Sequence, residues 1–508
     1  MSTCLRDALV SHLAALPNAA ELGLTILVSA SKRTTALFPH APSATVRCWE
    51  TEYLVVMHSG VPGLAEGASG ASHASQVGST TSATAATASS TAPAQLNTSV
   101  QSIPSTQPSL TAESTPTTES NPTTQTKPTT NPSPTPTTHP PAPRVLAAAI
   151  SAHLYTLPSP DPTSILYISK VDSSGYAPPS PLTRALSSGF LSYFLSPSTR
   201  PGGPLGSVTA TLFARSQGQY LFPNSVEGGG KRVLGGLGLC QWWKSVFEDT
   251  ARLVGDVELA YLLPSYSASE AKGILGARRQ GAEWTYAPPF QVPMFRAKRS
   301  LATLIPSLPD DPKTRFLEEL VSSALDTPAT HKDGKEKEGK RSRKDVEAAE
   351  DEAERRRAHG ALARVPVDEF WERMGFRQEC ASGDVTGFFS ARVGPESKED
   401  KERSPSVEEG GRYEPPRTPY AVSKPLVERI LTSMLNTDFG TRTLAYAGTD
   451  MWLASTRALV IDEVGEDGWT ASTASIAPKA SAGSAVAPPP KRKEETVTML
   501  QPRKKKRV

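Results

Sequence analysis

The feature that most limits how this chain can fold is a stretch at residues 67–142 composed almost entirely of Ser, Thr, Pro, Ala, Asn and Gln. It contains no Phe, Trp or Tyr, and its only charged residues are Glu113, Glu119 and Lys127. Such a segment cannot bury enough apolar surface to offset the entropy lost on ordering it. Because the cost of closing a loop grows slowly with its length, we predict a disordered insert or linker between segments that fold.

Three further stretches read as breaks in the folded chain. Residues 329–360 carry a dense mixture of both charges, which indicates a solvated helix or a disordered insert. Residues 395–417 are charged and contain Pro, and the chain from 463 onward is Ala/Ser/Pro-rich and then basic. We therefore predict one composite domain over 1–462 with disordered inserts at 67–142, 329–360 and 395–417, followed by a disordered basic tail at 463–508.

Charge is distributed unevenly along the chain. The net charge is +3, but residues 491–508 alone hold eight Lys or Arg against two Glu, so the rest of the chain is at −3. A globally basic nucleic-acid binder would spread its charge differently. A mildly acidic body suits a basic substrate, and we expect no sequence-specific binding of nucleic acid.

The cysteines and the apolar segments indicate the cellular setting. Cys4, Cys48, Cys240 and Cys380 show no CxxC spacing and no His at ligand spacing, so we predict neither a zinc site nor a disulfide framework. The N-terminus lacks a signal-peptide pattern. No apolar stretch is long enough to cross a membrane. We expect a soluble intracellular protein without a membrane partner.

The folded segments alternate between helix and strand patterns. Leu5, Leu9 and Leu13 fall on one helical face, and 22–30 and 51–58 have the composition of strands. We expect helices at 144–155, 181–195, 239–253, 310–325, 367–376 and 424–435, and strands at 164–171, 207–216, 257–264 and 385–393. This alternation predicts an α/β fold with a mixed central sheet flanked by helices.

Short motifs of common enzymes are absent or incomplete. The GGGKR stretch at 228–232 is not a phosphate-binding P-loop, because its Lys is followed by Arg. The stretch RSQGQY at 215–220 nearly matches the pyrophosphate loop of common acetyltransferases but fails at its last position. A common-type acetyltransferase is therefore disfavoured.

A combination of longer segments is more specific. These segments are KVDSSGY at 170–176, FARSQGQYLFP at 213–223, KRVLGGLGLCQWWK at 231–244, LPDDPKTRFLEEL at 308–320, and FWERMGFRQEC with GDVTGFF within 370–389. Together they resemble the fungal histone H3 acetyltransferases, whose fold is distantly related to the metazoan CBP-type coactivator enzymes. The resemblance implies a CBP-like core and acetyl transfer from acetyl-CoA to lysines of histone H3.

The resemblance also implies catalytic roles, each beside a plainer interpretation. Asp311 matches the family's general base and Asp310 precedes it, although Asp before Pro312 is also an ordinary helix start. Lys313 matches a self-acetylated lysine and Tyr220 an active-site tyrosine. The resemblance places Trp242 by the cofactor and Trp243 by the substrate lysine; adjacent helical residues point about 100° apart, so one of the two is expected in the core.

A lysine amine must lose a proton before it attacks a thioester, so the chemistry needs a base, a dry slot and cations for the coenzyme phosphates. Asp172 lies in the turn expected after a strand, and an Asp at such a position is also explained by the ordinary preference of turns for this residue. Cys240 lies on an expected helix with no partner His in the sequence, so we expect direct transfer without an acetyl-enzyme, and we expect no metal. The resemblance implies a cofactor site built from Val171, Asp172, Ser173, Arg184, Phe213, Arg215, Gln217, Arg232, Val233, Leu234, Trp242 and Arg315.

The C-terminal PRKKKRV at 502–508, with KRK at 491–493, is typical of nuclear import signals. The resemblance implies histone H3–H4 as substrate, histone chaperones as partners, and a role in DNA replication, the DNA damage response and chromatin assembly. Its expected targets are a lysine at the start of the H3 globular core and tail lysines. Two alternatives stay open: a non-catalytic nuclear scaffold that binds histones or chaperones, and a DNA-binding regulator acting through the basic tail.

Overall fold

The computed structural model describes the folded segments on both sides of the long Ser/Thr/Pro stretch. The expected insert at 67–142 and the import signal at 502–508 lie outside the described residues. The structure describes residues 4–16, 21–41, 46–60, 143–157, 163–177, 181–200, 203, 206–276, 282–290, 300–325, 343–394, 415 and 418–477.

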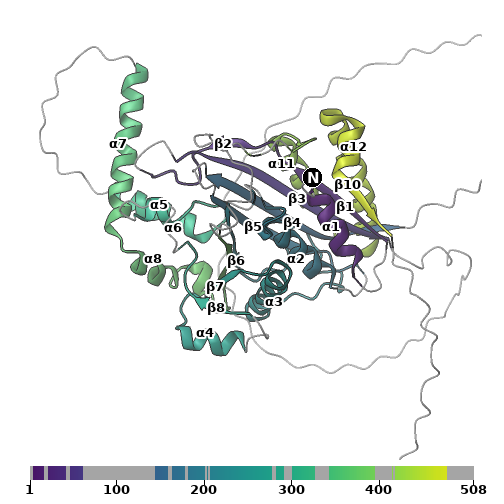
Figure 1. The fold of residues 1–508 in the computed structure, drawn as a ribbon, viewed down its shortest axis with the longest axis horizontal. Helices are drawn as coiled ribbons and strands as arrows, with labels where there is room; N and C mark the ends of the chain where they lie inside the picture. The colour runs from purple at the N-terminus through teal and green to yellow at the C-terminus, as the bar shows by residue number, and fades with distance from the viewer. Residues whose placement is uncertain are drawn as a thin grey trace, which may run out of the picture. The chain divides into compact units, whose positions relative to one another are not determined.

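One mixed sheet of ten strands forms the centre of the described fold (Figure 1). Its strand order is β10-β1-β3-β4-β5-β6-β9-β7-β8, with β2 paired to β3. The pairs β5–β6 and β7–β8 are parallel, and the other strand pairs are antiparallel. The strands are β1 (Leu22–Val28), β2 (Lys32–Thr34), β3 (Cys48–Gly60), β4 (Arg144–Leu157), β5 (Thr163–Ser173), β6 (Ser207–Ala214), β7 (Glu258–Leu262), β8 (Trp284–Tyr286), β9 (Gly387–Val393) and β10 (Thr473–Ile476).

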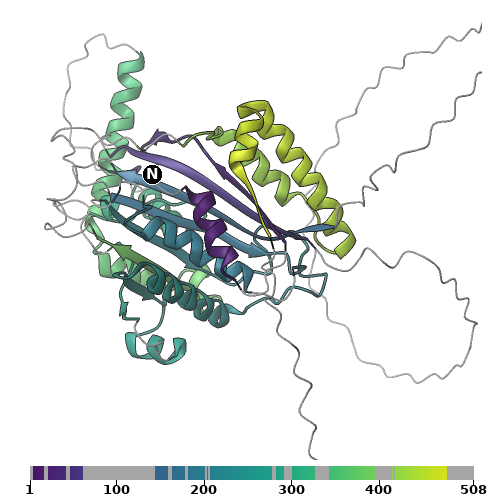
Figure 2. The same ribbon diagram turned by 45° about the vertical axis from the view of Figure 1, so that its right-hand side comes forward.

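Helices cover both faces of this sheet, which confirms the predicted α/β class (Figures 1 and 2). One face packs against α1 (Leu5–Ala14), α2 (Leu182–Leu195) and α3 (Gly236–Val254). On the other face, α11 (Lys424–Leu435) and α12 (Arg442–Ser472) cover β1, β3 and β4. Farther along it, α5 (Leu301–Leu304), α6 (Pro312–Leu325) and α8 (Val367–Met374) pack on β6 and β9. The remaining helices are α4 (Ala268–Leu275), α7 (Arg343–Arg364) and α9 (Gln378–Ala381).

The N-terminal helix is held by the leucine face that its sequence predicts. Leu5, Leu9 and Leu13 are all buried in the core shared with α2 and β10. Each buried leucine stabilises the fold by about 1.5–3 kcal/mol relative to an exposed one. The spacing of these three residues therefore fixes α1 against the sheet, although the segment is separated from most of the core by the long insert.

The helix expected at 144–155 is wrong, because this segment is the central strand β4. It pairs with β3 on one side and β5 on the other, and α2 and α12 pack on its two faces. Both of its faces are therefore buried, and its apolar run is nearly continuous rather than alternating. A run of this kind cannot be distinguished from a buried helix by periodicity alone. The alanines at 147–149 are better helix formers, but burial between two layers overrides that propensity.

The folded chain also continues past the expected boundary at 462. Helix α12 runs to Ser472 with a kink at Gly465, and β10 then pairs with β1 at the edge of the sheet. Residues 463–476 therefore belong to the domain, and the rest of the expected tail, residues 478–508, lies outside the described residues. The disordered insert predicted at 329–360 is wrong from Arg343 onward, because these residues belong to helix α7, whose Ala358 packs in the core cluster of α5, α6 and α8; the helical interpretation holds there.

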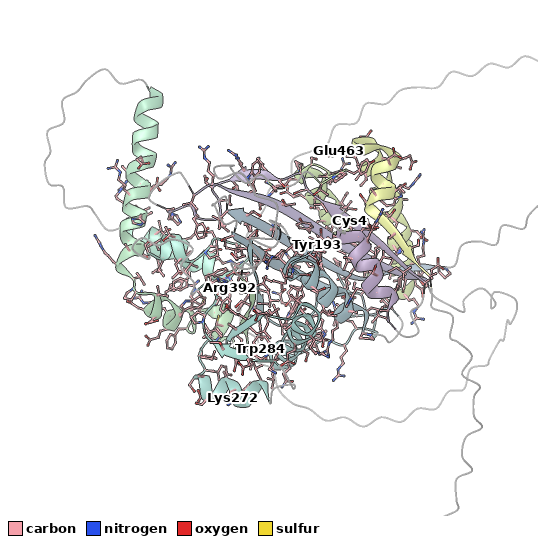
Figure 3. The ribbon with its side chains drawn as sticks, viewed as in Figure 1. Cys4, Tyr193, Lys272, Trp284, Arg392 and Glu463 are labelled. Carbon is pink, nitrogen blue, oxygen red and sulfur yellow. The ribbon has the colours of Figure 1, made fainter. Side chains whose placement is uncertain are left out.

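The far end of the sheet is closed by aromatic side chains around β8. Trp284 is labelled in Figure 3. Its ring packs edge-on against Phe247 of α3 at a centroid distance of 6.3 Å, and its indole N–H donates to Glu248 at 3.1 Å. This contact joins the short β8 to α3, whose other end reaches the cavity described below.

No helix among the described residues is long and apolar enough to cross a membrane. All four cysteines are free thiols, and Cys48, Cys240 and Cys380 are buried.

Candidate active site

The site lies where two neighbouring parallel strands separate. Strands β5 and β6 pair only from Thr163–Tyr167 to Ser207–Thr211. Beyond this point β5 continues beside β4 to Ser173, while β6 continues beside β9 to Ala214. The β5 edge facing the gap has no strand partner there among the described strands, so its backbone groups are available to a ligand.

A bulge in β5 aims side chains at this gap. Lys170 is paired with Ser151 and Ile168 with Ala152, so Ser169 is an extra residue in the strand. Ile168 and Val171 both pack toward the core beneath α2. The bulge therefore shifts the alternation, and Lys170 points to the opposite face instead. Bulges near active sites commonly re-aim side chains in this way.

A cavity of about 390 Å³ fills the gap between the two strands. Its wall combines apolar side chains such as Ile168, Leu212 and Leu239 with the cations Lys170, Arg184, Lys231 and Arg232. The cavity also brings together most of the predicted residues from four separate segments: Val171, Asp172, Ser173, Arg184, Phe213, Gln217, Tyr220, Arg232, Val233, Leu234, Trp242 and Trp243.

Both tryptophans of the WW pair line the cavity from helix α3. Their rings meet edge to face with centroids 4.8 Å apart. Trp243 is 6% exposed and belongs to the core, while Trp242 is only partly buried. The expectation that one of them is a core residue therefore holds for Trp243, which nevertheless contributes to the cavity wall as well.

The start of α3 is fixed by a distant carboxylate. Asp384, in the turn before β9, accepts a hydrogen bond from the Gly236 N–H at 2.7 Å. A side chain at Gly236 would place its Cβ 2.0 Å from the Val385 carbonyl oxygen, so only glycine permits this contact. The favourable interaction of a carboxylate with a helix N-terminus then holds α3, and with it the tryptophan pair, in place.

Asp172 is buried in the cavity wall and surrounded by donors. One carboxylate oxygen accepts the backbone N–H groups of Tyr220 and Leu221 at 2.8 and 2.9 Å. The other accepts the N–H of Ser173 at 2.8 Å and the Lys231 ammonium at 2.6 Å. The side chain thus ties the end of β5 to the 220–222 turn, which is more than the isolated turn role that its sequence context suggested.

Tyr220 lies beside Asp172 and donates its hydroxyl proton to the Arg215 carbonyl oxygen. Burial, together with the negative charge of Asp172, raises the pKa of Tyr220 to about 12. The hydroxyl therefore stays protonated at neutral pH, so Tyr220 is able to act as a donor and is unsuited to act as a base.

The two adjacent aspartates differ sharply in environment. Asp311 is 1% exposed, and its carboxylate lies 2.5 Å from the Nζ of Lys313, whose side chain is also fully buried. The Lys313 ammonium lies 4.4 Å from the centroid of the Phe388 ring. Burial lowers the pKa of Lys313, while the Asp311 charge opposes that change. Neither residue belongs to the cavity wall.

Asp310, in contrast, has a side chain that is 64% exposed and pairs with Lys170 of the cavity wall at 2.7 Å. This hydrogen bond from Lys170 is the main reason why the pKa of Asp310 is lowered. Its backbone has a φ of 57°, a conformation uncommon outside glycine and tolerated best by Asn and Asp. The turn thus presents one carboxylate toward the cavity while the next is buried.

Three predicted cofactor arginines are engaged elsewhere or lie apart. Arg184 borders the cavity but forms an ion pair with Asp249 at 2.5 Å. Arg215 does not line the cavity, although its carbonyl holds Tyr220. Arg315 is exposed on α6, pairs with Glu379 at 3.3 Å, and does not line the cavity either.

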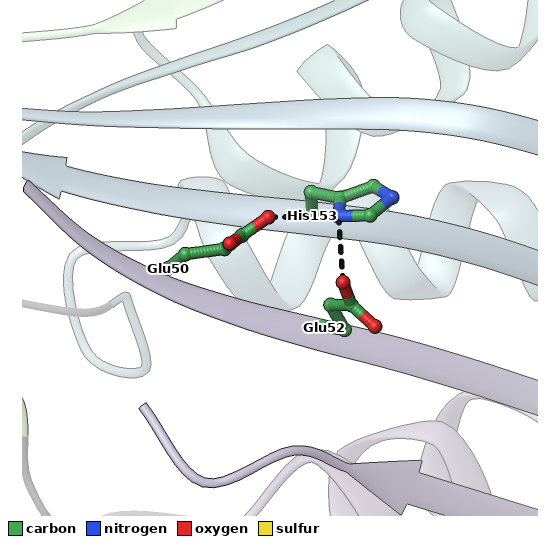
Figure 4. A group of neighbouring side chains, drawn as sticks. All are labelled: Glu50, Glu52 and His153. Carbon is green, nitrogen blue, oxygen red and sulfur yellow. Dashed lines mark ion pairs between the residues drawn. The ribbon is translucent and has the colours of Figure 1, made fainter. Parts of the chain in front are cut away.

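A second polar cluster lies on β3 and β4. The ring Nδ1 of His153 is 3.5 Å from Glu50 and 3.6 Å from Glu52, an arrangement of metal-ligand type (Figure 4). Lys424 of α11 supplies a positive charge to both carboxylates, with its Nζ 2.5 Å from Glu52 and 3.2 Å from Glu50. The cluster therefore joins α11 to the sheet through a lysine.

This cluster predicts a specific loss of stability in acid. Burial favours the protonated form of Glu50, but His153 and Lys424 outweigh it and lower the pKa to about 2. A carboxyl whose pKa is lowered by folding stabilises the protein above its unfolded pKa, and that stability is lost as pH falls toward about 2. We expect a loss of at most about 3 kcal/mol between pH 4.5 and 2. Urea unfolding at several pH values checks this, and Lys424→Met should flatten the dependence; an equally steep curve in the variant would contradict the assignment.

Three residues of the site were not singled out from the sequence. Lys170 and Lys231 both lie within motifs that were noted, and each pairs with a candidate aspartate. One residue, Val171, separates Lys170 from Asp172 on the same strand, and this closeness was the available signal for Lys170. The pairing of Asp384 with Gly236 spans 148 residues, and no local pattern points to it.

The chain is similar in sequence and in fold to known histone acetyltransferases. The family model described as the histone acetyltransferase KAT11-type domain matches residues 204–455. The histone acetyltransferase rtt109 of Aspergillus flavus is 29% identical over 276 residues, which are 48% of this chain and 43% of that protein. The protein of the same name from Schizosaccharomyces pombe is 28% identical over 238 residues, covering 45% of this chain and 52% of the relative. The chain thus spans about half the length of the curated relatives it matches.

A solved structure shows the same fold. The crystal structure of Rtt109 from Aspergillus fumigatus superposes with a TM-score of 0.58 at 21% identity, covering 91% of this chain and 97% of that one. The matched family model spans β6, the tryptophan helix α3 and the aspartate pair, which build one part of the cavity and its border; β5 and the start of α2, which line the rest, precede the matched residues. This chain therefore carries a KAT11-type histone acetyltransferase domain at residues 204–455, on a fold shared with Rtt109.

Proposed function

We propose that this protein transfers the acetyl group of acetyl-CoA to lysines of histone H3. The observation that carries the proposal is the cavity between the separated ends of β5 and β6, lined by Trp242 and Trp243 and bordered by the carboxylate of Asp310. An apolar channel with cations at its wall suits a coenzyme with an uncharged arm and a polyphosphate end. Arg232 is exposed at the cavity and has no carboxylate partner among the described residues, which leaves it free for a phosphate.

The reaction requires a substrate lysine to become neutral and attack the thioester carbonyl. Asp310 is the exposed member of the carboxylate pair, so it is placed to receive an incoming ammonium and take its proton. We propose that Asp311, in its buried ion pair with Lys313, supports the turn that carries Asp310. We propose that Tyr220 and Trp243 help to position the reacting groups. We assign the remaining predicted cofactor residues of the cavity wall to coenzyme binding.

Transfer is proposed to be direct. Cys240 is fully buried, and burial raises the pKa of its thiol to about 12. A buried, protonated thiol is a poor nucleophile. The proposed setting is the nucleus, with histone chaperones presenting H3–H4, and with a role in replication, repair and chromatin assembly.

The first test measures binding and transfer separately. Acetyl-CoA should raise the melting temperature of the protein, and labelled acetyl-CoA should transfer its acetyl group to H3 in an H3–H4 substrate, with and without a histone chaperone. Trp242→Ala should weaken binding and transfer because it removes part of the cavity wall. Trp49→Ala, which changes a tryptophan of β3 that does not line the cavity, should do neither.

The contrary result is equally clear. A protein that shows neither a thermal response to acetyl-CoA nor acetyl transfer in either arm would not be the proposed enzyme. Binding of histones or chaperones in that case would favour the non-catalytic scaffold.

A further inference from the structure

The buried ion pair between Lys231 and Asp172 lies in the wall of the proposed coenzyme cavity. We propose that Lys231 is a positioning residue for coenzyme binding that acts through Asp172. It cancels the charge of the Asp172 carboxylate, so that the wall can receive a polyanion, and it anchors the chain segment that follows it. This inference rests on the proposed binding of acetyl-CoA.

The contacts of Lys231 are internal to the protein. Its Nζ donates to Asp172 at 2.6 Å and to the Ser225 hydroxyl at 3.0 Å. The two charged side chains are only 7% and 5% exposed. Two of the three ammonium protons are thus committed to protein acceptors. A lysine that served directly as a phosphate ligand would keep its ammonium available to the cavity.

Among the described residues, Lys231 is the cation that forms an ion pair with Asp172. The Asp172 carboxylate also accepts backbone N–H groups from Ser173, Tyr220 and Leu221, which fix its position in the wall. Removing Lys231 would therefore leave a negative charge buried in the wall. Such a charge would repel the phosphates of a bound coenzyme, and breaking a buried pair by removing one partner is strongly unfavourable.

The backbone around Lys231 is packed as tightly as its side chain. Gly175 has a φ of 82°, and a Cβ there would lie 2.5 Å from the Lys231 nitrogen. A Cβ on Gly230 would lie 2.6 Å from the Gly175 carbonyl oxygen. The segment entering Lys231 is therefore seated directly on the turn after β5. The three residues that follow, at 232–234, all line the cavity, so this seat sets their position.

Two neighbouring cations serve as controls that distinguish the proposed role of Lys231 from other roles. Arg232 is exposed and has no carboxylate partner among the described residues, so it is the residue expected to contact phosphate directly. Lys244 forms a comparable buried pair with Glu248 at 2.6 Å but does not line the cavity. Substituting each of these three cations should have a different consequence.

The test is a charge-balance cycle read by calorimetric titration with acetyl-CoA. Lys231→Met is expected to weaken binding by about tenfold or more. The double variant Asp172→Asn/Lys231→Met removes both charges, and it should recover part of the affinity lost in Lys231→Met, binding more tightly than that single variant. Lys231→Arg, which keeps the charge, should retain more affinity than Lys231→Met. In steady-state assays the KM for acetyl-CoA should rise while the KM for histone is unchanged.

The controls separate this role from others. Arg232→Met should weaken binding without rescue by Asp172→Asn, and Lys244→Met should lower stability without changing acetyl-CoA affinity. A double variant as weak as Lys231→Met, or a Lys231→Met protein that binds as tightly as the wild type, would overturn the inference. If Lys231→Met does not fold, the double variant and Lys231→Arg still decide the matter. Failure of the wild type itself to bind acetyl-CoA would instead contradict the proposed function.

Discussion

Replacing Lys313 with Met is expected to destabilise the protein by about 3–5 kcal/mol. The Lys313 side chain is fully buried, and its ammonium lies 2.5 Å from Asp311, which is equally inaccessible. The variant would leave the Asp311 carboxylate without its partner in a region that water does not reach. The measurement is equilibrium unfolding in urea followed by circular dichroism.

Two companion variants test the cause of this loss. Asp311→Asn/Lys313→Met removes both charges and should recover most of the lost stability, because a buried pair contributes little net energy over uncharged groups of similar size. Lys272→Met, on the exposed face of α4, should change stability by no more than about 0.5 kcal/mol. A Lys313→Met protein as stable as the wild type would show that the buried ion pair with Asp311 does not stabilise the turn.

Periodicity locates most directly the helices that bury one face. Helices α1 and α8 each bury a single apolar stripe, so periodicity locates them. Strand β4 has no such stripe, because α2 and α12 bury both of its faces, and its alanine-rich run resembles a helix in isolation. The end of the domain at β10 was missed because a short strand is stabilised by its pairing with β1, more than 440 residues earlier.

The sequence predicted which segments form the site, but it did not predict which charged side chains pair with one another. Motifs carrying Asp172, Arg232 and the tryptophan pair do meet at one cavity. Which charge meets which is decided by tertiary structure: Lys231 is 59 residues from Asp172, and Lys170 is 140 residues from Asp310. The bulge at Ser169, which aims Lys170, leaves no local signature either. A carboxylate pair in sequence therefore gave no indication that one member is exposed and the other buried.

Replacing Asp310 with Asn is expected to lower kcat/KM for histone acetylation by about 10²–10⁴-fold with little change in stability. Asp310 is the exposed carboxylate at the border of the cavity, and the amide keeps its shape while losing its capacity to take a proton. The Asp310 side chain of the ion pair with Lys170 is 64% exposed to solvent, so loss of the pair costs no more than about 1 kcal/mol. Because the pKa of Asp310 is lowered, the carboxylate is ionised throughout the neutral range, and the defect should be similar from pH 6 to 9.

The comparison with the neighbouring carboxylate decides the roles of the pair. Asp311→Asn removes a partner from a fully buried ammonium, so its defect should include a measurable loss of stability. Glu318→Gln changes another exposed carboxylate of α6 away from the cavity, and it should retain full activity. We would measure initial rates under saturating acetyl-CoA and urea unfolding midpoints for all three variants. Together these measurements distinguish a residue that transfers the proton from one that supports the fold of the site. An active Asp310→Asn protein, together with an inactive but fully stable Asp311→Asn protein, would move the base to Asp311 and require the turn at 310–311 to open when substrate binds.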